Sequence, residues 1–116
     1  MSTVNHTRTE PFGINSVELF TWATMGGADV GDAIGFPQNA DKSVQIDGTF
    51  GSATVVIQGS NDGTNWFTLT DPQGNAISKT SAALEQIEEN TLYVRPSISG
   101  GTGSSINVRL LARRAF

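Results

Sequence analysis

Residues 43–58, the stretch SVQIDGTFGSATVVIQ, give the clearest indication of the fold class. Apolar side chains alternate with polar or small ones in both halves of it: Val44 and Ile46 in the first half, and Ala53, Val55 and Ile57 in the second. A period of two is typical of a half-buried β-strand. Gly51 and Ser52 lie between the halves and fit a two-residue turn with glycine at its first central position. The stretch therefore predicts two antiparallel strands joined as a hairpin.

The same alternation recurs on both sides of this stretch. Further strands are predicted over residues 16–24, 66–70, 91–99 and 106–111, separated by segments rich in Gly, Pro, Asn and Asp. The only helix candidate is 81–90, where Leu84 and Ile87 are three residues apart, and we expect at most two turns there. Short strands at this spacing predict an all-β domain, an antiparallel β-sandwich or jelly roll of about six to eight strands.

Two segments lack a sustained period. Residues 1–15 mix polar side chains with Pro11 and Gly13, so we expect an extended N-terminal arm followed by a single β-sandwich domain over 16–116. The arm is either a frayed end or a segment that becomes ordered on a partner. Residues 25–42 predict a long loop, and loops of this length tend to be functional.

Composition excludes several classes of function. The 116 residues carry a net charge of −4, which argues against a nucleic-acid partner because phosphate binding needs an excess of Lys and Arg. The absence of cysteine excludes disulfides, thiolate metal sites and a cysteine nucleophile. No apolar run approaches the roughly 20 residues of a membrane span, and the first residues do not have the order of a signal peptide. We expect no membrane partner and synthesis in the cytoplasm.

Residues that could carry chemistry are few and scattered. The single histidine, His6, lies in the arm, where we expect it to be exposed to solvent. The close acidic pairs are Asp29 with Asp32, which match no calcium-loop spacing, and Glu88 with Glu89, which point apart on any regular element. The sequence predicts no enzyme, no metal site and no cofactor.

The segment GSNDGTNW, residues 59–66, permits two interpretations. It resembles a sugar-binding turn, with Asn61, Asp62 and Asn65 around a Trp66 platform. It also fits a simple hairpin turn whose Trp66 closes the end of the core, and we favour this structural interpretation. Exposure of Trp66 separates the two, since a buried indole offers no platform.

Four segments taken together resemble a known family: 43–51, 55–77, 93–96 and 108–114. In order and spacing, residues 22–114 are similar to capsid cement or decoration proteins of short-tailed bacteriophages. The resemblance implies a jelly-roll-like β-sandwich on the outside of an icosahedral head, part of the virion, which clamps neighbouring major capsid proteins. Such a protein is made in the host cytoplasm and is expected to be a homo-oligomer, a dimer or trimer.

On this interpretation, contact residues should lie outside the periodic strands. The candidates for capsid contact are Phe12, Ile14, Val30, Ile34, Phe36, Arg113, Arg114 and Phe116. Phe20 and Trp22, expected on the outward side of the first strand, are candidates for self-association, unless the arm of the same chain covers them. The alternative functions are a carbohydrate- or receptor-binding module and a structural protein of the phage neck or tail.

Overall fold

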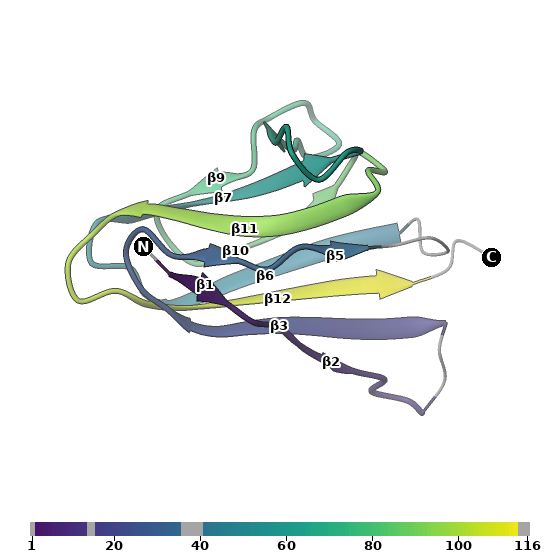
Figure 1. Cartoon of the computed structure of the whole chain (residues 1–116), viewed down its shortest axis with the longest axis horizontal. Helices are drawn as coiled ribbons and strands as arrows, with labels where there is room; N and C mark the ends of the chain where they lie inside the picture. The colour runs from purple at the N-terminus through teal and green to yellow at the C-terminus, as the bar shows by residue number, and fades with distance from the viewer. Residues whose placement is uncertain (1, 14–15, 36–40, 114–116) are drawn as a thin grey trace.

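The computed structural model describes residues 2–13, 16–35 and 41–113, and in these residues the fold is all-β with no helix. Two sheets pack face to face as a sandwich (Figure 1), which confirms the predicted class. In the described ranges, six strands have at least five residues: β3, β6, β7, β10, β11 and β12.

The five-stranded sheet contains most of the long strands. Its order is β10 (Ala83–Ile87), β6 (Asp41–Thr49), β12 (Ser105–Arg113), β3 (Val17–Met25) and β2 (Thr7–Thr9). All its neighbours are antiparallel. A β-bulge interrupts the register between β12 and β3 at Ile106 and Val108.

The seven-stranded sheet is built around two long strands, β7 and β11. Its order is β1 (Thr3–Val4), β4 (Val30–Gly31), β11 (Tyr93–Gly100), β7 (Ala53–Ser60) and β8 (Phe67–Thr68), while β5 (Ile34–Gly35) also pairs with β11 and β9 (Ser78–Lys79) with β7. The pairs are antiparallel except for β1 with β4, which are parallel.

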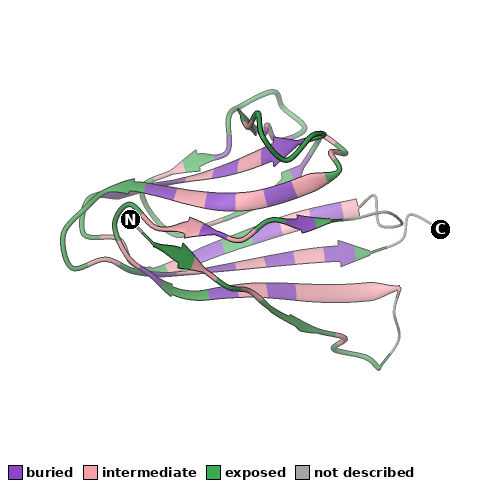
Figure 2. Cartoon of the chain, in the orientation of Figure 1, coloured by how far each residue is buried: buried purple, intermediate pink, exposed green. Residues whose placement is uncertain are grey.

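The core lies between the two sheets, where the inward side chains of both meet. Figure 2 shows the consequence as alternating buried and half-exposed residues along the long strands. The largest side chains with almost no exposure are Trp22, Met25, Ile46, Ile57, Ile77, Ile106 and Leu110. The period of two seen in the sequence is therefore the alternation between core and surface.

The predicted hairpin at residues 43–58 is wrong in its pairing, although both strands and the turn are present. Strand β6 pairs with β10 and β12, whereas β7 pairs with β11, β8 and β9 in the opposite sheet. The turn at Gly51 (φ 57°) and Ser52 (φ 71°) carries the chain from one sheet to the other. Both strands bury one face in the same core, so their alternation could not distinguish a hairpin from a crossing between sheets.

The helix expected within 81–90 is also wrong, because Ala83–Ile87 forms the edge strand β10. Ile87 is buried, and Ala83 and Glu85 lie on the same face of the strand, opposite the inward residues Ile46 and Val44 of β6. Leu84 faces outward and is 68% exposed. Leu84 and Ile87, three residues apart, therefore lie on opposite faces of a strand and not on one face of a helix.

The described part of the N-terminal arm belongs to the sandwich. Strand β1 extends the seven-stranded sheet beside β4, and β2 extends the five-stranded sheet beside β3. The loop expected over residues 25–42 likewise contributes the short strands β4 and β5, both paired with β11. Residues 3–4 and 7–9 therefore form strands within the domain itself.

Candidate functional site

Phe20 and Trp22 are not available for self-association, because both face the core. Phe20 is 5% exposed and Trp22 is fully buried. The first strand has large apolar side chains on both faces, and the sequence-based assignment chose the wrong face as inward. The alternative left open, that the arm of the same chain covers these rings, describes the structure.

The ring of His6, in the arm, packs against both rings. Its ring centroid lies 5.6 Å from that of Phe20 and 5.9 Å from that of Trp22. Its Nδ1 is 2.9 Å from both carboxylate oxygens of Asp32, and its backbone N–H donates to Asp32 Oδ1 at 2.8 Å. The expectation of a solvent-exposed histidine is therefore wrong: His6 is half-buried and fastens the arm to the β4–β5 connection.

The acidic pair Asp29 and Asp32 is occupied by donors from the protein. Asp32 also accepts from the Trp22 indole N–H at 3.0 Å, while Asp29 accepts from Gly26 N–H and from the Ser2 hydroxyl, both at 2.7 Å. Burial raises the pKa of Asp32, but the hydrogen bonds and charge of His6 outweigh it and the pKa is lowered. Within the described ranges, no group of three or more His, Cys, Asp or Glu residues could hold a metal ion.

The capsid-contact candidates fall into different environments. Phe12 is 76% exposed in the turn between β2 and β3, Arg113 is exposed at the end of β12, and Val30 is half-buried in β4. Ile34 is only 3% exposed and packs in the core, so it is not a surface contact. The predictions for Ile14, Phe36, Arg114 and Phe116 lie outside the described residues.

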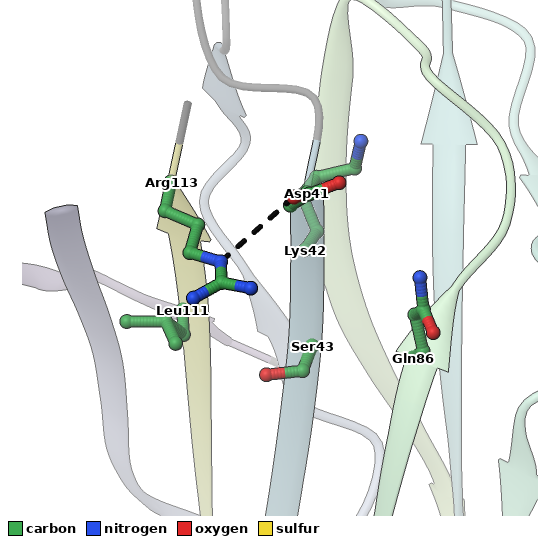
Figure 3. Close-up of a pocket in the computed structure, with 6 residues that line it drawn as sticks. All are labelled: Asp41, Lys42, Ser43, Gln86, Leu111 and Arg113. Atoms are coloured by element: carbon green, nitrogen blue, oxygen red, sulfur yellow. Dashed lines mark ion pairs between the residues drawn. The ribbon is translucent and has the colours of Figure 1, made fainter. Parts of the chain in front are cut away.

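Phe12 and Arg113 lie at the same end of the sandwich. Strands β3 and β6 begin at this end, and β5 and β12 finish there, as does the β2–β3 turn (Figure 1). A pocket of about 320 Å³ opens here on the five-stranded sheet, lined by Asp41, Lys42, Ser43, Gln86, Leu111 and Arg113 (Figure 3). We call Phe12 together with these six residues the strand-end surface, although in the sheet order β3 separates the β2–β3 turn from the strands that line the pocket.

The strand-end surface carries charged groups of both signs. Arg113 Nε lies 3.8 Å from Asp41 Oδ2, an exposed pair. Lys42 is buried and donates from Nζ to Asn90 Oδ1 at 2.6 Å. Burial lowers the pKa of Lys42, and the negative charges of Asp41 and Glu89 oppose that shift. The surface thus combines one protruding aromatic ring with a mixed, mostly polar hollow.

The turn at residues 60–65 is organised by the Asp62 carboxylate. Its Oδ1 accepts from the backbone N–H groups of Thr64 and Asn65 and from the Ser60 hydroxyl, each at 2.8 Å, and its Oδ2 accepts from Asn65 Nδ2. These bonds, with the Asn65 backbone foremost, hold the pKa of Asp62 far below its usual range. Asn61 Oδ1 accepts from the Leu92 N–H at 2.8 Å, so this turn uses its polar groups on itself and its neighbours.

Trp66 neither closes the core nor stands free. It is half-buried, and the Arg95 guanidinium lies over it with its Cζ 4.0 Å from the ring centre. The next residue, Phe67, is 70% exposed and lines a second pocket of about 320 Å³ together with Asn61, Asp62 and Asn65. Sequence reasoning missed both Arg95 and Phe67, although strand alternation at 66–68 would place Trp66 and Phe67 on opposite faces.

Comparisons with known proteins show that this chain is similar in fold to solved structures. No family model and no curated protein matches the sequence. Among solved structures, the SPBc2 prophage-derived protein YomS matches at TM-score 0.65 and 12% identity, over 85% of this chain and 96% of YomS. The PBSX exported protein XepA matches at TM-score 0.63 and 18% identity, over 85% of this chain and 39% of XepA. The chain thus spans nearly all of YomS and about two fifths of XepA, and shares their fold.

Proposed function

We propose that this protein is a structural component of a bacteriophage virion, a decoration protein that binds the outside of the head and bridges neighbouring major capsid proteins. The observation that carries the proposal is the fold, shared over 85% of the chain with a prophage-derived protein of nearly the same extent. The resemblance of residues 22–114 to phage cement proteins supports the finer assignment to the head. On this account the protein is made in the host cytoplasm and resides on the capsid surface.

The strand-end surface is the proposed contact with the capsid. Phe12 protrudes from a turn, and large aromatic side chains are enriched in the buried centres of protein interfaces. Full burial of one such ring on a partner contributes about 1.5–3 kcal/mol. Arg113 and Asp41 lie at the same end and supply a charged rim.

A binding role also agrees with the hydrogen bonds and pKa values of the acidic side chains. Asp29, Asp32, Asp62 and Glu89 each accept hydrogen bonds from protein donors, which lower their pKa values and keep them ionised. A general acid needs the opposite shift, toward neutral pH. We propose that the protein acts without catalysis, and that any dimer or trimer forms through surfaces other than Phe20 and Trp22.

The proposal is tested by adding protein back to heads stripped of it. Wild-type protein should restore occupancy and heat resistance, while Phe12→Ser should reduce occupancy at limiting protein concentration by about tenfold or more, since the buried ring is lost. Phe67→Ser is the matched control, because Phe67 is similarly exposed but belongs to the other sheet. Equal occupancy of Phe12→Ser and wild type would refute this contact surface.

A second candidate function is binding of a carbohydrate receptor at the pocket beside Phe67. The observation in its favour is an exposed aromatic ring next to the amides of Asn61 and Asn65. On this account Phe67, in place of Trp66, is the platform for a sugar. Specific binding of the protein to host-cell glycans, abolished by Phe67→Ser and retained by Phe12→Ser, would support this function.

A further inference from the structure

A rigid cation lies on the outer face of the seven-stranded sheet. Arg95 of β11 lies directly opposite Gln58 of β7, and its Nε donates to Gln58 Oε1 at 2.9 Å. Its guanidinium covers Trp66, 4.0 Å from the ring centre. Two contacts of different kinds therefore hold the plane of one arginine, and the pre-organisation lowers the entropy that a ligand contact would cost.

The other described cations have acidic partners. Ion pairs within 4 Å join Arg8 to Glu10 and Glu18, Lys79 to Glu85, Arg109 to Asp47, and Arg113 to Asp41. Lys42 is buried, lies in the field of Asp41 and Glu89, and donates to Asn90.

Arg95 differs from all of them. Among the described residues no carboxylate lies within ion-pair distance of it, although the chain has 11 acidic residues and only 7 Lys and Arg. Burial lowers the pKa of Arg95, and no acidic neighbour offsets that effect. A partly desolvated charge without a counter-charge is costly, and a carboxylate beside Arg95 would offset that cost.

We propose that Arg95 and Trp66 form a docking site for the carboxylate of an Asp or Glu side chain on the surface of a protein partner. The Nε of Arg95 is taken by Gln58, and its two terminal amino groups make no hydrogen bond within the described residues. Two parallel N–H donors match the two oxygens of a carboxylate. The site does not depend on the proposed position of the protein in a virion.

A protein partner fits this surface better than a free saccharide. The site lies on the outer face of a β-sheet, and its half-buried neighbours on that face are uncharged: Gln58 opposite Arg95, and Val56 and Ser97 two residues further along the two strands. Tyr93 lies on the same face of β11, two residues from Arg95. Trp, Tyr and Arg are the residues that contribute most often to the energetic centres of protein interfaces, whereas small ligands favour concave sites.

The test titrates the full chain with the capped tripeptide Gly-Glu-Gly and with its neutral match, Gly-Gln-Gly, while NMR follows the Trp66 indole and Arg95 side-chain N–H resonances. The glutamate peptide should give saturable shifts at both groups, and the glutamine peptide should not. Arg95→Gln should weaken the binding measured at the Trp66 indole at least about tenfold. Arg95→Lys should retain only part of the wild-type binding, because lysine keeps the charge but lacks the two parallel N–H donors of arginine. Arg109→Gln is the control, since Arg109 already pairs with Asp47.

Three results would overturn the proposal. One is an unchanged Trp66 response in Arg95→Gln that retains the wild-type fold by circular dichroism. Another is an equal response to the glutamine peptide, which would show that no carboxylate is recognised. The third is binding of sialyllactose, an acidic saccharide, without binding of the glutamate peptide, which would assign the site to a glycan.

Discussion

At the scale of single residues, Asp62 determines the conformation of the turn between β7 and β8. Its carboxylate accepts four hydrogen bonds, from Thr64 N–H, Asn65 N–H, Asn65 Nδ2 and the Ser60 hydroxyl. The side chain is exposed, so these bonds stabilise the turn in contact with water. The ionised form is the one that the folded protein favours.

Asp62 should make folding depend on pH in acid. Its pKa in the folded chain lies below the ordinary value, so its contribution is present above about pH 4 and is lost as the pH falls toward the lower folded pKa. In urea unfolding between about pH 5 and pH 2, the free energy of unfolding should decline less steeply in Asp62→Asn than in wild type. If the free energy of unfolding declined equally steeply with pH in both proteins, the folded state would not favour the ionised form of Asp62.

Individual residues also show where the sequence misleads. In β3, Leu19 and Thr21 form one face and Phe20 and Trp22 the other, and both faces carry large apolar groups. Hydrophobicity alone could not determine which pair faced the core. The same applies to His6, whose partner Asp32 lies 26 residues away in a segment without a recognisable period.

At the scale of elements, the β6–β7 connection is a sharp crossing between sheets. Gly51 has φ of 57°, and a Cβ there would lie 2.2 Å from the Thr102 carbonyl oxygen. Ser52 also has a positive φ, 71°, which a residue with a Cβ adopts at a cost. A side chain added at position 51 should therefore destabilise the turn, whereas a side chain removed at position 52 should not.

Substitution in this turn should separate the two effects. Gly51→Ala should lower the free energy of unfolding by more than about 1 kcal/mol, because strain and a backbone clash coincide. Ser52→Gly should be neutral or raise it by up to about 1 kcal/mol, because glycine adopts a positive φ without strain. Chemical denaturation of both variants measures this, and comparable losses in the two would contradict the described turn.

The N-terminal strands should be needed for full stability. Removal of residues 1–9 deletes β1, β2 and His6, and so uncovers Phe20 and Trp22. We expect the truncated chain to lose at least roughly 5 °C in Tm, and its tryptophan emission to shift to the red as water reaches Trp22. The Trp66→Phe background assigns that shift to Trp22. An unchanged Tm and spectrum would mean that the arm does not cover these rings.

Much of the element pattern was predictable, and the pairing was not. The period of two located the strands of β3, β6, β7, β11 and β12 because each has one face in the core. It gave no information about partners, so β6 and β7 were wrongly joined as a hairpin. The short strands β1, β2, β4 and β5 have too few residues to show a period, and only their hydrogen bonds to longer strands define them.

At the scale of the whole molecule, the two sheets form one compact body. The radius of gyration is 13.2 Å, close to the roughly 13 Å expected for a compact domain of this length. Several strand ends and the β2–β3 turn gather at one end, while the Arg95 site occupies the outer face of the seven-stranded sheet. The sequence indicated Phe12 and Arg113 as contacts because both lie outside the strands that it predicted, but Arg113 is the last residue of β12, and their common location depends on the fold.

The number of copies in purified virions tests whether the protein is a decoration protein of the phage head. Quantitative mass spectrometry, with the major capsid protein as the internal standard, measures that number. We predict a copy number of the same order as that of the major capsid protein, because a decoration protein repeats with the lattice that it covers. A copy number more than about tenfold lower, as expected for a ring in the neck or tail, or absence from the particle, would contradict the claim.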